Sequence, residues 1–167
     1  MTKFRKDYGQ NYQEHLLEQY KLYVEMADRI SSRRQSANSF FLSINTAIAS
    51  LLGYVGLEHQ NKTDYFWTVS LIGMALCFMW YRLVRSYKDL NSAKFKVIHE
   101  IEKELPVAAY DLEWEKVGRG ENSKLYLPFT HIEIMIPWVF FAIHFLIFCF
   151  SMLKGILPIF KLKICNS

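Results

Sequence analysis

The sequence predicts an all-α membrane protein with three transmembrane helices, cytoplasmic helical extensions and a homo-oligomeric ring. The chain of 167 residues is 51% hydrophobic, and its apolar residues gather in three blocks instead of following the period of a soluble helix or strand. Each block reaches the roughly 20 apolar residues that a helix needs to cross a bilayer. One block also repeats small polar residues at heptad spacing, which favours closed assembly around a common axis.

The segments are expected in the following order. An N-terminal cytoplasmic amphipathic helix is expected at 1–35. Two of the apolar blocks, 65–81 and 134–153, carry no charged residue. The predicted spans are 36–56, 65–85 and 134–153, with a cytoplasmic helical segment and loop at 86–133 and a C-terminal tail at 154–167.

The first helix is predicted to run unbroken from the cytoplasm into the membrane. Asn11 and Glu14 have the spacing of a capping box, and no Gly or Pro follows before Gly53. An apolar seam with steps of four and three residues predicts a packing face. The seam consists of Leu16, Tyr20, Tyr23, Ala27 and Ile30.

The segment after the second span predicts a matching seam. Apolar residues recur there at steps of three and four until Pro106 interrupts the helix, and we expect the two seams to pack on each other. The seam consists of Leu90, Ala93, Val97, Ile101 and Leu105. The stretch VAAYDLEWEKV predicts a short helix, and GRGENSKLYLPF predicts a loop.

Basic residues set the expected orientation. They cluster before the first span and after the second, whereas the short connection between these spans holds only Lys62. The positive-inside rule therefore places the N-terminus and 86–133 in the cytoplasm. The third span then leaves the basic tail outside, which the rule does not favour. Aromatic residues near the span ends suggest interfacial anchors: Trp67, Trp80, Tyr81 and Trp138.

The first span carries a polar stripe of small residues, which we define as Ser32, Ser36, Ser39, Ser43, Thr46, Ser50 and Gly53. Alternating steps of four and three confine the stripe to one helix face, with Phe41, Ile44 and Ile48 on the opposite face. Small residues could serve tight helix packing. Two flanking asparagines favour a wet lumen, because a buried amide needs water or a partner from a neighbouring copy. The predicted pore-lining residues are Ser36, Asn38, Ser39, Ser43, Asn45, Thr46 and Ser50.

Two further sets of residues are expected to serve the assembly. Arg29, Arg33 and Arg34 could act as topology signals; repeated around a ring, they would form a basic cytoplasmic mouth that attracts anions. Residues expected to pack in the oligomer are Leu16, Tyr20, Tyr23, Val97, Ile101 and Gly73.

The sequence offers no support for catalysis. It holds no Gly-rich phosphate loop and no Ser/His/Asp set, and its cysteines lack metal-ligand spacing. We therefore predict no catalytic, cofactor-binding or metal-binding residue, no cofactor and no direct nucleic-acid binding. His144 lies in the third span, where a proton relay would need an acidic partner that the three predicted spans lack. A neutral His144 that bonds a neighbouring helix is the favoured interpretation.

Three strings carry a resemblance to a known family. YKLYVEMADRISSRRQSANSFFLSINTAIASLLG, AKFKVIHEIEKELPVAAYDLEWEKVG and YLPFTHIEIMIPWVFF resemble the RipA-type family of small octameric membrane proteins. The similarity covers about residues 20–138. It implies a bacterial inner-membrane octamer associated with phage defence, similar in concept to the pore-forming membrane accessory of RNA-targeting CRISPR systems.

Together these features predict an oligomeric membrane pore that leaks the inner membrane in anti-phage defence. The expected partners are further copies of the chain, membrane lipid and a phage or host trigger protein. The alternative is a non-conducting membrane scaffold that recruits a cytoplasmic defence partner.

Overall fold

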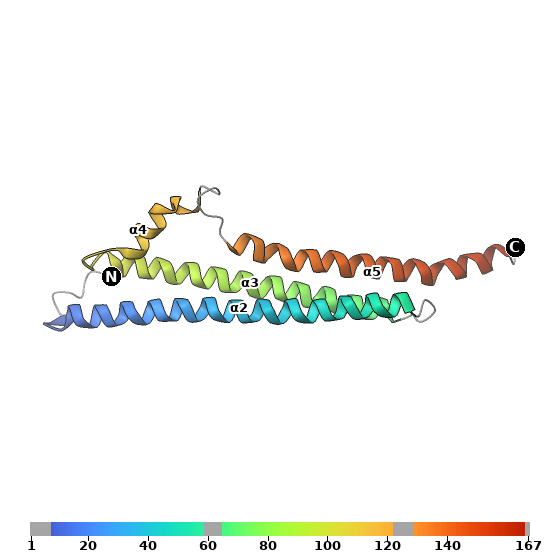
Figure 1. Ribbon diagram of the computed structural model, residues 1–167, viewed down its shortest axis with the longest axis horizontal. Coiled ribbons are helices and arrows are strands. Elements are labelled where there is room, and N and C mark those ends of the chain that lie inside the picture. The colour runs from blue at the N-terminus through green and yellow to red at the C-terminus, as the bar shows by residue number, and fades with distance from the viewer. Residues whose placement is uncertain (1–7, 59–64, 122–128, 166–167) are drawn as a thin grey trace. The chain divides into compact units, whose positions relative to one another are not determined.

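The computed structural model describes residues 8–58, 65–121 and 129–165, and side chains of the last range from 132 to 154 (Figure 1). The elements are α2 (Tyr12–Glu58), α3 (Phe66–Glu102), α4 (Ala109–Lys116), the short 3-10 helix η2 (Gly118–Gly120) and α5 (Phe129–Cys165). The described residues contain no strand. Because three of the helices are long and apolar enough to cross a membrane, the predicted class of all-α membrane protein is confirmed.

The expectation of an unbroken first helix is confirmed. Helix α2 has 47 residues, which at 1.5 Å per residue corresponds to about 70 Å. This is about twice the roughly 30 Å of the hydrocarbon core, so α2 must continue well beyond one side of the membrane. The predicted short helix in 107–117 is also present, as α4.

The chain divides into two compact units. The charged unit contains 1–35 and 86–130, and the membrane unit contains 36–85 and 131–167. In the charged unit, α2 carries an acidic or basic residue on nearly every turn, which excludes this part of the helix from hydrocarbon.

The core of the membrane unit is aromatic. Phe41 of α2 stacks on Trp80 of α3 with ring centroids 5.9 Å apart and planes at 9°. Phe140 of α5 lies 6.2 Å from the Trp80 ring, and buried Val84 completes the cluster. Phe41 thus faces inward, opposite the polar stripe. The interpretation of Trp80 as an interfacial anchor was wrong, because its side chain is 1% exposed.

The α2 seam of the charged unit also faces inward, since Ala27 and Ile30 are buried and the other seam residues are half-buried. The expected α3 seam was wrong at its start, because Leu90 and Ala93 are exposed while Ile98 is fully buried.

The physical reason is that a lysine occupies an inner position of α3. The ammonium group of Lys94 lies 5.3 Å from the centroid of the Tyr23 ring. A lysine can pack its aliphatic stem inside and present its charge to an aromatic face. A seam read from apolar residues alone omits such a position.

Gly73 makes a close contact within one chain, and its role in packing between copies stays a prediction. A Cβ atom built on Gly73 would lie 2.5 Å from Cε1 of His144. The absence of a side chain on α3 therefore allows the imidazole of α5 to lie directly against the α3 backbone.

We expect Gly73→Ala to destabilise the membrane unit by about 1–3 kcal/mol, the usual cost of overpacking. The measurement is thermal unfolding in mild detergent. Gly53→Ala is the matched control, because a Cβ at Gly53 meets nothing within 4 Å. Equal unfolding midpoints for the two variants would show that the contact with His144 does not constrain Gly73.

Candidate functional site

Two asparagines of α2, one heptad apart, each connect all three helices of the membrane unit. At the first level, Trp80 Nε1 of α3 donates to Asn38 Oδ1 at 2.8 Å. Asn38 Nδ2 in turn donates to Glu133 Oε1 of α5 at 2.9 Å. The Asn38 amide thus has partners from the same chain for both its acceptor and its donor group.

The second level is centred on Asn45, whose side chain is fully buried. Its Oδ1 accepts from Cys77 Sγ of α3 at 3.2 Å and lies 3.3 Å from His144 Nε2 of α5. Its Nδ2 donates to the carbonyl oxygen of Phe41 at 2.8 Å. Since Oδ1 is an acceptor, this contact requires the imidazole hydrogen on Nε2. His144 therefore bonds a neighbouring helix, as expected.

These contacts concern two of the predicted pore-lining residues. The sequence argument assigned Asn38 and Asn45 to a lumen, because their amides needed water or a neighbouring copy. The structure instead gives both amides partners on α3 and α5. The reason is that Cys77, Trp80 and Glu133 are far from α2 in sequence and become partners only when the helices pack.

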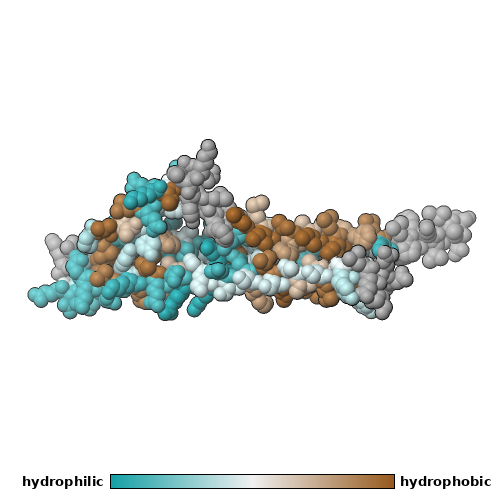
Figure 2. Space-filling view, viewed as in Figure 1, coloured by the Kyte–Doolittle hydropathy of each residue, from teal (hydrophilic) through white to brown (hydrophobic). Residues whose placement is uncertain are grey.

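The remaining pore-lining candidates lie on the opposite side of α2. All five are exposed on the single chain: Ser36, Ser39, Ser43, Thr46 and Ser50. Figure 2 shows a pale band along the membrane part of α2, whereas the α5 residues of the same unit are mostly strongly hydrophobic. The described structure therefore separates an inner amide face of α2 from an outer hydroxyl face.

Glu133 and Glu102 are two buried acids that the sequence analysis missed. Glu133 is 8% exposed and lies inside the helical stretch 132–154 that could span the membrane. Glu133 directly precedes the predicted span 134–153, which itself contains no acidic residue. The available signal was a single acidic residue directly before a long apolar block.

The three arginines of the predicted basic mouth differ in environment. Arg29 pairs with Glu25 at 2.6 Å on the same helix, so its charge is balanced locally. Arg33 is exposed, whereas Arg34 is half-buried.

In the charged unit, Glu102 accepts hydrogen bonds from three elements. Tyr20 Oη of α2 donates to Oε1 at 3.0 Å, and the Tyr110 and Asp111 amides of α4 donate at 2.9 and 3.3 Å. His99 Nδ1 lies 3.3 Å from Oε2. Burial, with the bond to Glu102, raises the pKa of Tyr20 to about 12, so its hydroxyl remains protonated at physiological pH.

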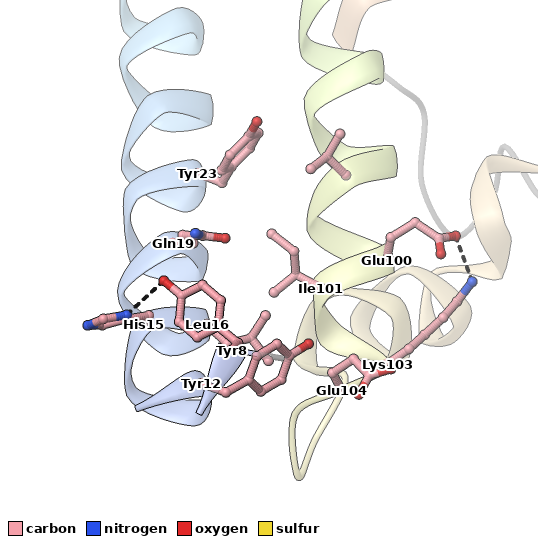
Figure 3. A pocket seen from close by; sticks show the side chains of 11 residues that line it. Tyr8, Tyr12, His15, Leu16, Gln19, Tyr23, Glu100, Ile101, Lys103 and Glu104 are labelled. Carbon is pink, nitrogen blue, oxygen red and sulfur yellow. Dashed lines mark hydrogen bonds and ion pairs between the residues drawn. The ribbon is translucent and has the colours of Figure 1, made fainter. Parts of the chain in front are cut away.

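A groove of about 530 Å³ lies between α2 and α3 of the charged unit (Figure 3). The groove is lined within one chain by four residues that we expected to pack in the oligomer: Leu16, Tyr23, Val97 and Ile101. Tyr20 bonds Glu102 of the same chain. Their role in packing between copies stays a prediction. The groove rim carries the exposed Glu100–Lys103 pair, with Lys103 Nζ 2.6 Å from Glu100 Oε1.

The described residues hold no group of three His, Cys, Asp or Glu side chains that could bind a metal ion. The polar groups of the membrane unit instead connect its helices. The fold and these contacts define a multi-pass helical membrane protein.

The octameric membrane protein family (8xMP) matches residues 17–153, and the chain belongs to this family. The resemblance to a family of small octameric membrane proteins is thereby confirmed. No curated protein and no solved structure matches the chain.

We expect Asn45→Ala to destabilise the protein by about 1–3 kcal/mol, because Cys77 and His144 both lose their acceptor in a dry interior. Hydrogen bonds in membranes average about 0.6 kcal/mol, which favours the lower end. Ser43→Ala, on the exposed face, is the control and should change stability by less than about 0.5 kcal/mol. Denaturant unfolding in detergent measures both. Similar losses in the two variants would contradict the assignment of Asn45 to the core.

Proposed function

We propose that copies of this chain form a ring whose α2 helices enclose an aqueous pore through the bacterial inner membrane. Membership in an octameric membrane family supports self-association of eight copies. The role in phage defence is supported by the family resemblance of the sequence. In this proposal the ring leaks ions when infection is sensed, and growth stops.

The exposed hydroxyl face of α2 carries this proposal. A lipid-facing surface of a membrane helix is normally apolar, and the exposed residues of α5 fit that rule, Val139 at 57%, Leu146 at 68% and Phe150 at 59%. The stripe residues Ser39, Ser43 and Thr46 are also exposed but are hydroxylated. Because three helices cannot enclose a channel by themselves, the stripe would line a space shared by several copies.

The second candidate function is the non-conducting scaffold. The internal partners of Asn38 and Asn45 favour it, because these amides no longer require water. In a scaffold the hydroxyl stripe would pack against a neighbouring copy, with hydroxyls bonded to their own backbone. The two functions differ in whether water reaches the stripe.

The proposed orientation places the N-terminus and the 86–121 part of the charged unit in the cytoplasm. Four basic residues precede the first span: Lys21, Arg29, Arg33 and Arg34. Three more lie at the end of the second span or directly after it: Arg82, Arg85 and Lys88. Positive residues favour the cytoplasmic side. The exposed Arg33 would then lie at the cytoplasmic mouth and disfavour cations there.

Cysteine accessibility tests the pore directly. We expect Ser39→Cys, Ser43→Cys, Thr46→Cys and Ser50→Cys to react with water-soluble thiol reagents in assembled, leaking rings, because thiolate formation needs water. Phe41→Cys, Ile44→Cys and Ile48→Cys should stay protected. The background carries Cys77→Ser, which keeps a hydroxyl donor for Asn45, with Cys149→Ala and Cys165→Ala. If no stripe cysteine reacts with the reagents in rings that arrest growth, the pore is excluded and the non-conducting scaffold remains as the supported function.

A second test changes the wetting of the lumen. Ser43→Leu should reduce ion leak from proteoliposomes by about tenfold or more, because a ring of apolar side chains favours dewetting of a narrow pore. Asn45→Leu cannot serve this purpose, since Asn45 is buried within the chain. Ala142→Leu, an exposed position of α5, enlarges an apolar side chain away from the stripe and should leave the leak unchanged. The same leak from both variants would exclude Ser43 from the lumen.

A further inference from the structure

A cluster of aromatic and basic side chains marks the end of the apolar surface on α3. The uncharged block 65–81 ends at Tyr81, and Arg82 and Arg85 follow it. Arg85 Nη1 donates to Tyr81 Oη at 3.0 Å. Since the hydroxyl oxygen accepts this bond, its own hydrogen remains available for another acceptor. We define the interfacial cluster as Tyr81, Arg82, Arg85 and Trp138.

Helix α5 supplies the other side of this cluster. The centroid of the Trp138 ring lies 5.2 Å from that of Tyr81 and 5.6 Å from that of Phe141. Trp138 is nevertheless 48% exposed. Tryptophan and tyrosine prefer the depth at which the lipid headgroups meet the hydrocarbon. The contact between Tyr81 and Trp138 therefore indicates that α3 and α5 reach this depth side by side, with the two arginines at the level of the headgroups.

The positive charge of Arg82 is not balanced within the described part of the membrane unit. In the stretches 65–85 and 132–154 the acidic residue is Glu133, which is buried and accepts from Asn38. Arg82 is exposed and makes no ion pair with a residue that the structure describes. A guanidinium group presents a planar fork of donors that matches the oxygens of a phosphate group. The cluster is therefore suited to a phosphate-bearing anion.

An apolar strip continues from the arginines along the same side of α3. Residues at steps of three and four share one face of a helix, which places Leu71 and Phe78 in line with Arg82 and Arg85. Both apolar side chains are exposed, Leu71 at 51% and Phe78 at 53%. At 1.5 Å per residue, the strip from Arg82 back to Leu71 is about 16 Å long. This is about half of the roughly 30 Å hydrocarbon core, so the strip matches the acyl chains of one leaflet.

We propose that the interfacial cluster binds an anionic phospholipid. Arg82 and Arg85 bind the phosphate oxygens, the Tyr81 hydroxyl donates to the same headgroup, and one acyl chain lies along Leu71 and Phe78. A headgroup whose only charge is the phosphate fits best, because the ammonium group of a zwitterionic headgroup would be repelled by two guanidinium groups. The site does not depend on whether the stripe of α2 conducts ions.

Lipid retention by the full-length assembled protein tests the site. The protein in mild detergent receives phosphatidylglycerol or phosphatidylcholine with the same acyl chains, and native mass spectrometry counts the lipids that stay bound. The wild type should prefer phosphatidylglycerol. Arg82→Gln should reduce this preference roughly fivefold, the usual contribution of one basic residue near an anionic surface, and Arg82→Gln with Arg85→Gln should abolish it. Equal retention of both lipids by the wild type would overturn the proposal.

Lys21→Gln with Arg29→Gln is the matched control, because it also removes two positive charges from exposed residues. Each of these residues belongs to the charged unit and pairs with a glutamate about one turn earlier on α2, Glu18 and Glu25. The control should keep the preference for phosphatidylglycerol. An equal loss of preference in the control and in the arginine variant would show that net charge selects the lipid, and the site would be wrong.

Quenching of Trp138 locates the lipid without any change to the arginines, so this test does not require an arginine variant to fold. Vesicles of phosphatidylcholine contain a small, equal fraction of brominated phosphatidylglycerol or brominated phosphatidylcholine. The signal of Trp138 is the difference in fluorescence between the wild type and Trp138→Phe, which keeps an aromatic ring. We expect stronger quenching by the brominated phosphatidylglycerol. Equal quenching by the two brominated lipids would contradict a site at the cluster.

A soluble phosphate ester separates a lipid site from a site for free anions. Glycerol phosphate carries the phosphate group without acyl chains, so it lacks the contacts along the apolar strip. Millimolar glycerol phosphate should therefore leave bound phosphatidylglycerol in place, as measured by the same mass spectrometry. Complete displacement of the lipid would show that the arginines bind the phosphate group alone, and the assignment of a phospholipid would fall.

Discussion

The packing of the membrane unit depends on two side-chain amides of α2 that each bond both other helices. Asn38 joins Trp80 and Glu133, and Asn45 joins Cys77 and His144. A polar group in a dry interior is costly without partners, so each amide disfavours any rotation or sliding of the helices that would break its bonds. The contacts also set direction: as α2 proceeds from 38 to 45, the partners run backwards on α3 and forwards on α5. Apolar packing alone would specify this register less strictly.

The orientation of α2 follows from the same contacts. With the amides and Phe41 turned toward α3 and α5, the hydroxyl face must turn outward. Gly73 allows His144 to approach closely enough for this arrangement, because no side chain separates the imidazole from the α3 backbone. The exposed surface of α2 therefore carries the hydroxyl stripe, flanked by the exposed apolar side chains of Phe40, Leu42 and Leu51, while the exposed face of α5 is apolar. An octameric assembly then needs only to bring the hydroxyl faces toward one axis to shield them from lipid.

The charged unit applies a similar principle outside the membrane. A buried carboxylate is stable only when donors surround it, and Glu102 receives them from α2, α3 and α4. One acid therefore caps α4 and fixes its position beside α3, where few apolar contacts would hold it.

The sequence by itself determined the class of the protein, the three spans, the unbroken α2 and the short helix α4, because apolar block length and the lack of helix breakers are local properties. It also identified the inner position of Phe41 and the hydroxyl face, since both follow from helical period. Only the tertiary structure decided which partners Asn45, Gly73 and Glu102 have, because those partners come from distant segments. The same reason explains why Lys94 occupies an inner position that a pattern of apolar residues does not predict. Its ammonium group lies over the ring of Tyr23, which belongs to a different helix far back in the sequence.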